Sequence, residues 1–299
     1  MKDSGITKII DNLCNATVHQ LPLTRIRLFV ARILYVLLHC ILGKDKHLIQ
    51  RQGVSYEVDL SEGIDLSLFL FGNFQNYITN NKLFSVAKNA VIFDIGANFG
   101  SMALKFAQLA PNGRVFAFEP TSYAFDKFRR NLSLNPELAG IIKPIQVFVS
   151  DQTSAQPQIK AYSSWKVDGS AVDKHPLHGG TIKSTEFVPA ITVDDFCFQY
   201  EIPKVDLIKI DTDGHELQVL RGARKTLERY YPILIFEIGL YVLREQKISF
   251  ELYYGFLSSL GYCMFNSKNG REIMLENYPT QIPSRSTTDI VAIPKMDCS

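Results

Sequence analysis

The sequence predicts a doubly wound α/β fold built on a mostly parallel sheet. Short runs of β-branched and aromatic residues alternate with helical patterns, which indicates βαβ units. These runs are continuously apolar, as in strands buried on both faces. A glycine-rich turn joins the first run to the next helix. The expected strands are Val91–Asp94, Val115–Glu119, Ile145–Val149, Val205–Asp211 and Ile233–Glu237, and the expected helices are Ser101–Leu109, Ser122–Leu134 and Glu216–Leu227.

The composition is that of an ordinary globular protein. The 299 residues include 32 Lys and Arg against 30 Asp and Glu, a net charge of +2, and 46 % are hydrophobic. These values exclude a disordered chain and a collagen, and no nucleic-acid partner is expected. Five scattered cysteines and a polar N-terminus without a secretory signal predict a reducing, cytoplasmic location.

We expect an N-terminal helical extension at residues 1–52 and an α/β domain at 53–299, with its core at 90–295. The extension carries an apolar stripe at helical spacing over residues 23–42, three arginines, and no acidic residue from 12 to 44. Its longest uncharged run, Ile33–Gly43, is well short of the ~20 residues that span a bilayer. Three interpretations stay open: docking on the protein itself, peripheral membrane contact, or a partner interface.

Each expected strand ends in, or is closely followed by, a carboxylate. In doubly wound sheets, ligands bind in the crevice beyond the carboxyl ends of the strands. Carboxylates gathered there repel one another unless a cation or several hydrogen-bond donors lie among them. The pattern therefore suits a positively charged ligand better than a pyrophosphate. The residues are Asp94, Glu119, Asp151, Asp211 and Glu237.

The turn after the first strand is similar to a dinucleotide-binding loop but departs from it at one position. Gly96 and Gly100 fit the pattern, whereas Asn98 stands where a second glycine would let the backbone approach a pyrophosphate. Glu119, at the end of the second strand, is placed to accept both hydroxyls of a ribose. Loop and acidic crevice together favour S-adenosylmethionine, whose sulfonium and ammonium groups are cationic. A turn that serves only helix–strand packing is the alternative.

Several motifs occur in the order found in class I S-adenosylmethionine-dependent methyltransferases, and the chain resembles the FkbM family among them. The resemblance covers about residues 70–295, and the block from Asp206 to Ala223 is its most specific part. The motifs are Phe93–Gly100 (FDIGANFG), Ala117–Pro120 (AFEP), Thr192–Phe196 (TVDDF), Val205–Leu217 (VDLIKIDTDGHEL), Val219–Ala223 (VLRGA) and Pro232–Glu237 (PILIFE).

The resemblance implies a Rossmann-like, seven-stranded sheet closed by an antiparallel pair at Tyr262–Phe265 and Asp289–Pro294, with S-adenosyl-L-methionine as cofactor. Asp213 stands where the family commonly has Glu, which leaves a carboxyl there on a shorter side chain. The residues implied in cofactor binding are Asp94, Gly96, Ala97, Asn98 and Gly100 for the methionine end, Glu119 for the ribose, and Ser150 and Asp151 near the adenine.

The residues after the fourth and fifth strands supply candidate bases. Methyl transfer to an alcohol needs alignment and benefits from a base within hydrogen-bond reach. Asp213 and Glu216 also fit a capping box, with Asp213 as the N-cap, and His215 fits an exposed helix start equally well. We expect the catalytic groups among Asp211, His215 and Glu237.

Lys209 precedes Asp211 by two residues on a buried strand, so the two share a face. A buried lysine needs a partner, and a structural ion pair or a substrate-orienting cation is expected. Asp211 and Asp213 lack an evident third ligand for a divalent metal, so no metal site is predicted. His175 and His178 lie in a Gly-rich loop and are expected to be solvated.

The long insertion at about residues 152–193 is expected to form a hairpin from Gln158–Trp165 and Glu186–Val193. It would overhang the crevice, where Tyr162 and Trp165 could pack on a sugar ring. The resemblance implies methylation of a hydroxyl on a small metabolite, sugar or glycoconjugate. A non-catalytic binding module and a nucleotide-dependent oxidoreductase are the alternatives, and Asn98 counts against the latter. The sequence leaves the oligomeric state open.

Overall fold

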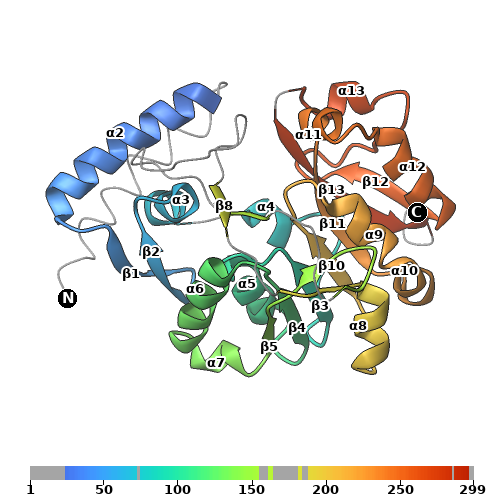
Figure 1. Cartoon of the computed structure of the whole chain (residues 1–299), viewed down its shortest axis with the longest axis horizontal. Helices are drawn as coiled ribbons and strands as arrows, with labels where there is room; N and C mark the ends of the chain where they lie inside the picture. Colours follow the sequence, from blue (N-terminus) through green and yellow to red (C-terminus); the bar gives the residue numbers. More distant parts are fainter. Residues whose placement is uncertain are drawn as a thin grey trace. The chain divides into compact units, whose positions relative to one another are not determined.

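The computed structural model describes residues 24–72, 75–154, 161–163, 181–183, 188–284 and 286–295. The chain divides into two compact units (Figure 1). The first comprises residues 1–76, 133–135 and 162–183, and the second comprises residues 77–132, 136–161 and 184–299. The division falls after residue 76 rather than after residue 52, because the strand and helix that follow residue 53 pack with the N-terminal elements.

The first unit contains α2 (Thr24–Leu42), β1 (Lys46–Arg51), β2 (Val54–Asp59) and α3 (Gly63–Phe71). β1 and β2 form an antiparallel hairpin. Its two turn residues, Gln52 and Gly53, have φ values of +51° and +80°, as tight hairpin turns require. The helix expected over residues 23–42 is present as α2. No helix in the described part of the chain is long and apolar enough to cross a membrane.

The second unit is built on a seven-stranded sheet in the order β12-β13-β11-β10-β3-β4-β5. The five strands from β11 to β5 are parallel, and β13 is antiparallel to both β11 and β12. This confirms the predicted fold class. The strands are β3 (Val91–Ile95), β4 (Arg114–Phe118), β5 (Ile142–Ile145), β10 (Leu207–Ile210), β11 (Ile233–Gly239), β12 (Tyr262–Asn266) and β13 (Thr287–Pro294).

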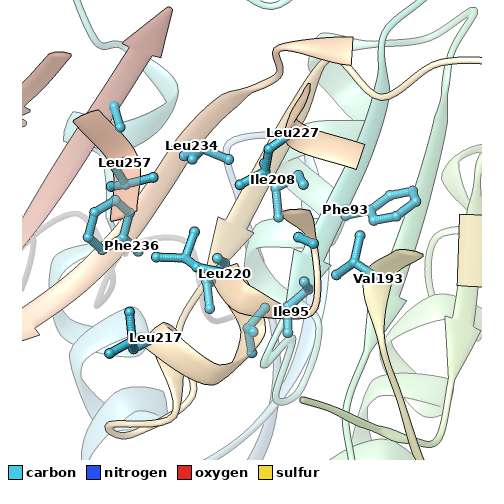
Figure 2. Close-up of a cluster of buried hydrophobic side chains, with 14 of the residues drawn as sticks. Phe93, Ile95, Val193, Ile208, Leu217, Leu220, Leu227, Leu234, Phe236 and Leu257 are labelled. Atoms are coloured by element: carbon cyan, nitrogen blue, oxygen red, sulfur yellow. The ribbon is translucent and has the colours of Figure 1, made fainter. Parts of the chain in front are cut away.

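Helices cover both faces of this sheet. They are α4 (Asn76–Thr79), α5 (Ser101–Leu109), α6 (Ser122–Ser133), α7 (Pro136–Ala139), α8 (Val193–Gln199), α9 (Glu216–Arg221), α10 (Arg224–Tyr230), α11 (Leu240–Glu245), α12 (Phe250–Ser259) and α13 (Tyr278–Gln281). Figure 2 shows the apolar core that α8, α9, α10 and α12 form with one face of the sheet. Phe196 of α8 lies edge-on to Phe93, Phe116 and Phe118, with ring centroids 4.9–5.6 Å apart.

Alternation along the central strands separates this core from the residues of the candidate site. Phe93 and Ile95 on β3, and Ile208 on β10, belong to the core. Because successive side chains of a strand point to opposite faces, Asp94 and Lys209 point to the other side. Asp94 and Lys209 therefore lie on the face of the sheet opposite to this core.

Three predicted elements differ in the structure. The third strand of the sheet is β5, not Ile145–Val149, because Lys143 and Pro144 interrupt its apolar pattern; an edge strand tolerates proline. Phe148–Val149 is β6, which pairs with β9 (Ala190–Ile191) outside the main sheet.

The helix expected over residues 216–227 is two helices that meet at Gly222, where a Cβ atom would lie 2.1 Å from the Ser150 carbonyl oxygen. In the insertion, β7 (Ala161–Ser163) pairs with β8 (Thr181–Lys183), which is earlier than the expected second strand.

Candidate active site

Pairing of neighbouring strands gathers four carboxylates and one lysine in a row across the sheet. Asp94 on β3 is the register partner of Lys209 on β10, and Glu237 on β11 is the register partner of Asp289 on β13. Asp211 follows Lys209 by two residues and points to the same face. We call Asp94, Asp211, Glu237 and Asp289 the acidic row.

Lys209 lies between the first two acids of this row. Its Nζ atom is 3.2 Å from Asp211 Oδ2 and 3.5 Å from Asp94 Oδ1. Burial alone would lower the pKa of Lys209, but the Asp211 and Asp94 carboxylates outweigh burial and raise it. Burial also raises the pKa of Asp94, and the charge of Lys209 opposes that shift. The ion pair expected for Lys209 is confirmed.

Asp94 is completely buried, and neither carboxyl oxygen has a hydrogen-bond partner in the described part of the chain. Buried carboxylates are costly unless paired, so the ion pair with Lys209 is the contact that allows Asp94 to remain here. Asp94 therefore holds the Lys209 ammonium group in place from a position that solvent does not reach. Direct contact between Asp94 and the cofactor stays a prediction.

The outer part of the site holds more carboxylates than cations. The Asp211 side chain is 28 % exposed. Burial, then the charges of Asp211 and Asp289, raises the pKa of Glu237 well above its usual range, although the Thr287 hydroxyl donates a hydrogen bond to Oε1. The pKa of Glu237 is raised because too little positive charge lies among these acids.

Asp213 occupies the loop after β10 with a φ of +52°, in the left-handed region that few non-glycine residues adopt. Solvent reaches this side chain, yet enough protein surrounds the carboxyl to reduce its hydration. This desolvation, followed by the charges of Asp211 and Glu216, raises the pKa of Asp213 to about 8. A strained backbone and a shifted carboxyl pKa are both features of functional loops.

The glycines of the loop after β3 are required by packing within the protein. Gly96 has a φ of +81°, and a Cβ atom there would lie 1.8 Å from the Asp211 carbonyl oxygen. Gly100 has a φ of +85°, and its Cβ would lie 2.0 Å from the Phe128 ring. Ala97 is buried, and the amides of Gly96 and Ala97 both donate to the Phe118 carbonyl oxygen. Packing thus accounts for the glycines, and a role of this loop in cofactor binding stays a prediction.

Glu119 ties this loop to the end of β4. Its Oε2 accepts a hydrogen bond from the Asn98 amide at 2.9 Å, while Oε1 accepts from the amide and hydroxyl of Thr121. A carboxylate offers about four acceptor positions, so three are occupied and one remains on Oε2. One acceptor position of Glu119 is thus left for a ligand, and a contact between Glu119 and a ribose stays a prediction.

Ser150 and Asp151 do not follow a strand of the main sheet, because the third strand ends at Ile145. They follow β6, where Asp151 is exposed and accepts a hydrogen bond from Ser150 Oγ at 3.3 Å. Gln146 is the residue that directly follows the third strand, and its Nε2 donates to Ser122 Oγ at 2.9 Å. Placing Asp151 among the strand-end acids was therefore wrong, and its proximity to an adenine stays a prediction.

Glu216 has the structural role that its position suggested, but by another geometry. α9 begins at Glu216 with His215 as its N-cap, so Asp213 lies outside the helix and the predicted capping box is wrong. Glu216 Oε1 instead accepts hydrogen bonds from the amides of Thr212 and Gly214 and from the Thr212 hydroxyl. His215 is partly exposed beside this loop, and a catalytic role for it stays a prediction.

Two site residues escaped the sequence analysis. Asp289 is buried, and the Tyr77 hydroxyl donates a hydrogen bond to it. Burial, followed by the charge of Asp289, raises the pKa of Tyr77, and Lys268 lies 5.4 Å from the centre of the Tyr77 ring. The sequence could have indicated Asp289, because it begins a strand expected to close the sheet next to the strand of Glu237. No sequence pattern indicated Tyr77.

Some predicted residues lie outside the described part of the chain. These are His175, His178, Trp165 and the side chain of Tyr162. Within the described ranges, no group of three or more His, Cys, Asp or Glu side chains could hold a metal ion.

Five parallel strands continued by an antiparallel pair form the sheet of the class I methyltransferase architecture. The sequence matches the methyltransferase FkbM domain over residues 94–264, more than half of its length. The chain belongs to the FkbM methyltransferase family, and the predicted resemblance is confirmed.

Characterised relatives share part of the chain. It is 27 % identical over 138 residues to the hexuronic acid methyltransferase AglP of Haloferax volcanii, covering 46 % of this chain and 52 % of that protein. It is 30 % identical over 152 residues to the 2-O-methyltransferase NoeI of Sinorhizobium fredii, covering 46 % and 59 %. The chain thus spans between about half and three fifths of these relatives.

Among solved structures, methyltransferase FkbM from Methylobacillus flagellatus KT is 18 % identical, with a TM-score of 0.42. The alignment covers 76 % of this chain and 52 % of that chain.

Proposed function

We propose that this protein uses S-adenosylmethionine to methylate a hydroxyl group of a sugar or glycoconjugate. Membership in the FkbM family supports methyl transfer. The names of two relatives, a hexuronic acid methyltransferase and a 2-O-methyltransferase, support a carbohydrate hydroxyl as acceptor. Both relatives are longer than the region they share with this chain, so the carbohydrate acceptor is proposed by analogy with them.

The observation that carries the proposal is the excess of carboxylates at the carboxyl ends of the strands. Asp211 pairs with the buried ammonium group of Lys209, and the pKa values of Asp213 and Glu237 are raised. A ligand that carries positive charge relieves this repulsion, whereas a pyrophosphate increases it. The residues therefore fit S-adenosylmethionine, and they argue against a dinucleotide.

Each residue of the site would have a separate task. When bound, S-adenosylmethionine supplies a methyl group on a positively charged sulfur. Asp211, which is paired with Lys209, would attract that charge, and the free acceptor position on Glu119 Oε2 would bind a ribose hydroxyl. Asn98, whose backbone N–H donates a hydrogen bond to Glu119 Oε2, would hold the loop in place. Alignment of donor and acceptor supplies much of the rate in such a displacement.

A carboxylate with a raised pKa would take the proton of the acceptor hydroxyl. Glu237 and Asp213 hold a proton more tightly than an ordinary carboxyl group, which makes their ionised forms stronger bases. His215 is the remaining candidate. Glu237→Gln, Asp213→Asn and His215→Ala, tested one at a time at saturating S-adenosylmethionine, identify the base by a loss of kcat with little change in the KM for the acceptor.

Calorimetric titration with S-adenosylmethionine and S-adenosylhomocysteine tests the cofactor, and transfer of labelled methyl to uronic-acid-containing oligosaccharides tests the acceptor. At pH 9, where Asp213 is ionised, Asp213→Asn should weaken S-adenosylmethionine binding roughly tenfold, about 1.4 kcal/mol, because asparagine tolerates a positive φ but carries no charge. Asp126→Asn is the matched control, since Asp126 is exposed on α6. Absence of binding to either ligand refutes the proposal, and binding without transfer to any acceptor would indicate a non-catalytic module.

A further inference from the structure

Helix α2 carries apolar residues on two opposite faces. Leu38 is buried and Leu34, Tyr35 and Leu42 are half-buried, and they recur at the spacing of one helix face. This face accounts for the packing of α2 within the first unit, where it contacts α3. The apolar residues of the other face are exposed: Ile33 by 45 %, Val36 by 55 %, Leu37 by 53 % and Ile41 by 68 %.

The exposed residues form a continuous stripe, which we call the outer stripe. Ile33, Val36, Leu37 and Ile41 are separated by three, one and four positions, so they follow one another along a single side of the helix. A helix on the surface of a soluble protein normally carries polar residues on its outward side. A run of large aliphatic side chains there marks a surface that a partner covers.

Most charged residues in and directly after the helix of the outer stripe are basic. From residue 24 to residue 48 the basic residues are Arg25, Arg27, Arg32, Lys44 and Lys46, whereas Asp45 is the acidic residue. Arg32, Lys44 and Lys46 are exposed, and Asp45 forms a 2.8 Å contact with His39 Nδ1. Leu48 on β1 of the same unit is also exposed, by 68 %.

This combination favours an anionic bilayer over a second copy of the chain. Two copies joined through the outer stripe would bring two clusters of cations together, and like charges near each other oppose association. Lipid phosphates would instead neutralise these cations. α2 is not long and apolar enough to cross a membrane, so it would lie along the surface.

We infer that α2 binds the surface of a membrane that contains anionic lipids. Ile33, Val36, Leu37 and Ile41 enter the boundary between headgroups and acyl chains, and the neighbouring arginines and lysines contact lipid phosphates. The inner face of the helix keeps its packing within the first unit. This interaction is independent of the methyltransferase activity proposed above.

Sedimentation of the full chain with vesicles tests the inference. The protein should co-sediment with vesicles of phosphatidylcholine mixed with phosphatidylglycerol, less with phosphatidylcholine alone, and less as salt is added. The double substitution Leu37→Glu and Ile41→Glu should lower the partition coefficient at least tenfold. Arg32→Gln should lower it about fivefold. Phe198→Glu is the matched control, because Phe198 is 88 % exposed on α8 in the other unit and should change nothing.

The double variant replaces exposed side chains only, so its thermal unfolding midpoint and far-ultraviolet circular dichroism should match those of the unmodified protein. Three results would overturn the inference. The first is no sedimentation with anionic vesicles, and the second is equal sedimentation of the double variant. The third is a dimer, seen by light scattering, that the double variant converts to a monomer, because the stripe would then join two copies of the chain.

Discussion

Replacing Lys209 by Met removes the cation that lies between Asp94 and Asp211. Lys209 Nζ is 3.5 Å from the first carboxylate and 3.2 Å from the second. The methionine side chain has a similar length, so the change removes the charge with little loss of packing. Asp94 is completely buried, so in the variant its charge would stay in the interior without the ammonium group that faces it.

The expected loss of unfolding free energy at pH 7 is about 3–5 kcal/mol, as for other buried pairs that lose one member. Asp94 can avoid the buried charge by taking up a proton. For a carboxyl group with an unfolded-state pKa near 3.9, holding a proton at pH 7 costs roughly 4 kcal/mol, at 1.36 kcal/mol per pH unit. The two routes agree, and the loss is a large part of a typical domain's stability.

The loss should depend on pH with a definite sign. In the variant, the folded-state pKa of Asp94 lies above its unfolded-state value, so the folded state binds the extra proton. Stability then falls as the pH rises above the unfolded-state pKa, and the difference from the unmodified protein shrinks towards pH 4. Urea unfolding between pH 4 and pH 8, monitored by circular dichroism, measures both the loss of unfolding free energy and its dependence on pH.

Two companion variants separate the ion pair from other effects of the substitution. Lys204→Met removes one member of a surface pair, in which Lys204 Nζ lies 2.9 Å from Asp206 Oδ2 and both side chains are more than a third exposed. It should cost less than about 1 kcal/mol. Asp94→Asn combined with Lys209→Met should show a coupling energy of about 1–3 kcal/mol. A loss below about 1 kcal/mol for Lys209→Met at pH 7, or one that does not change with pH, would refute the reasoning.

The remaining predictions concern the two loops of the site. Gly100→Ala should destabilise the protein by more than about 2 kcal/mol, because the positive φ of Gly100 and the Phe128 ring both exclude a Cβ atom. Gly255→Ala is the control, since a Cβ atom there meets nothing within 4 Å, and it should leave the melting temperature equal or higher. The same loss of stability in both variants would contradict the prediction. Glu119→Gln should lower the free energy of unfolding by about 1–3 kcal/mol, because the side-chain nitrogen of the glutamine would face the backbone N–H of Asn98 or Thr121. An unchanged thermal unfolding midpoint would show that the loop does not depend on these hydrogen bonds. Since the pKa of Asp213 is about 8, affinity for S-adenosylmethionine should rise between pH 7 and pH 9 as the carboxyl ionises, and Asp213→Asn should abolish the rise in calorimetric titrations.

Local pattern was enough to predict the central sheet. The strands that begin at Val91 and Ile233 start where the sequence indicated, and the helix Ser101–Leu109 has the expected bounds, because a continuous apolar run and a 3.6-residue period are visible in short windows. Lys209 and Asp211 were placed on one face by the two-residue period of a strand alone. The third strand was misplaced because Pro144 breaks the apolar run at the sheet edge, where burial imposes little pattern.

Sequence by itself thus determined the fold class, the family and the carboxylates that end the central strands, since periodicity and burial are written in neighbouring residues. Only the tertiary structure decided that Asp289 lies opposite Glu237 and that the Tyr77 hydroxyl binds Asp289. It also placed Asp151 away from the acids at the strand ends of the main sheet. These relations depend on which distant segments pair and in which register, and no local periodicity records that choice.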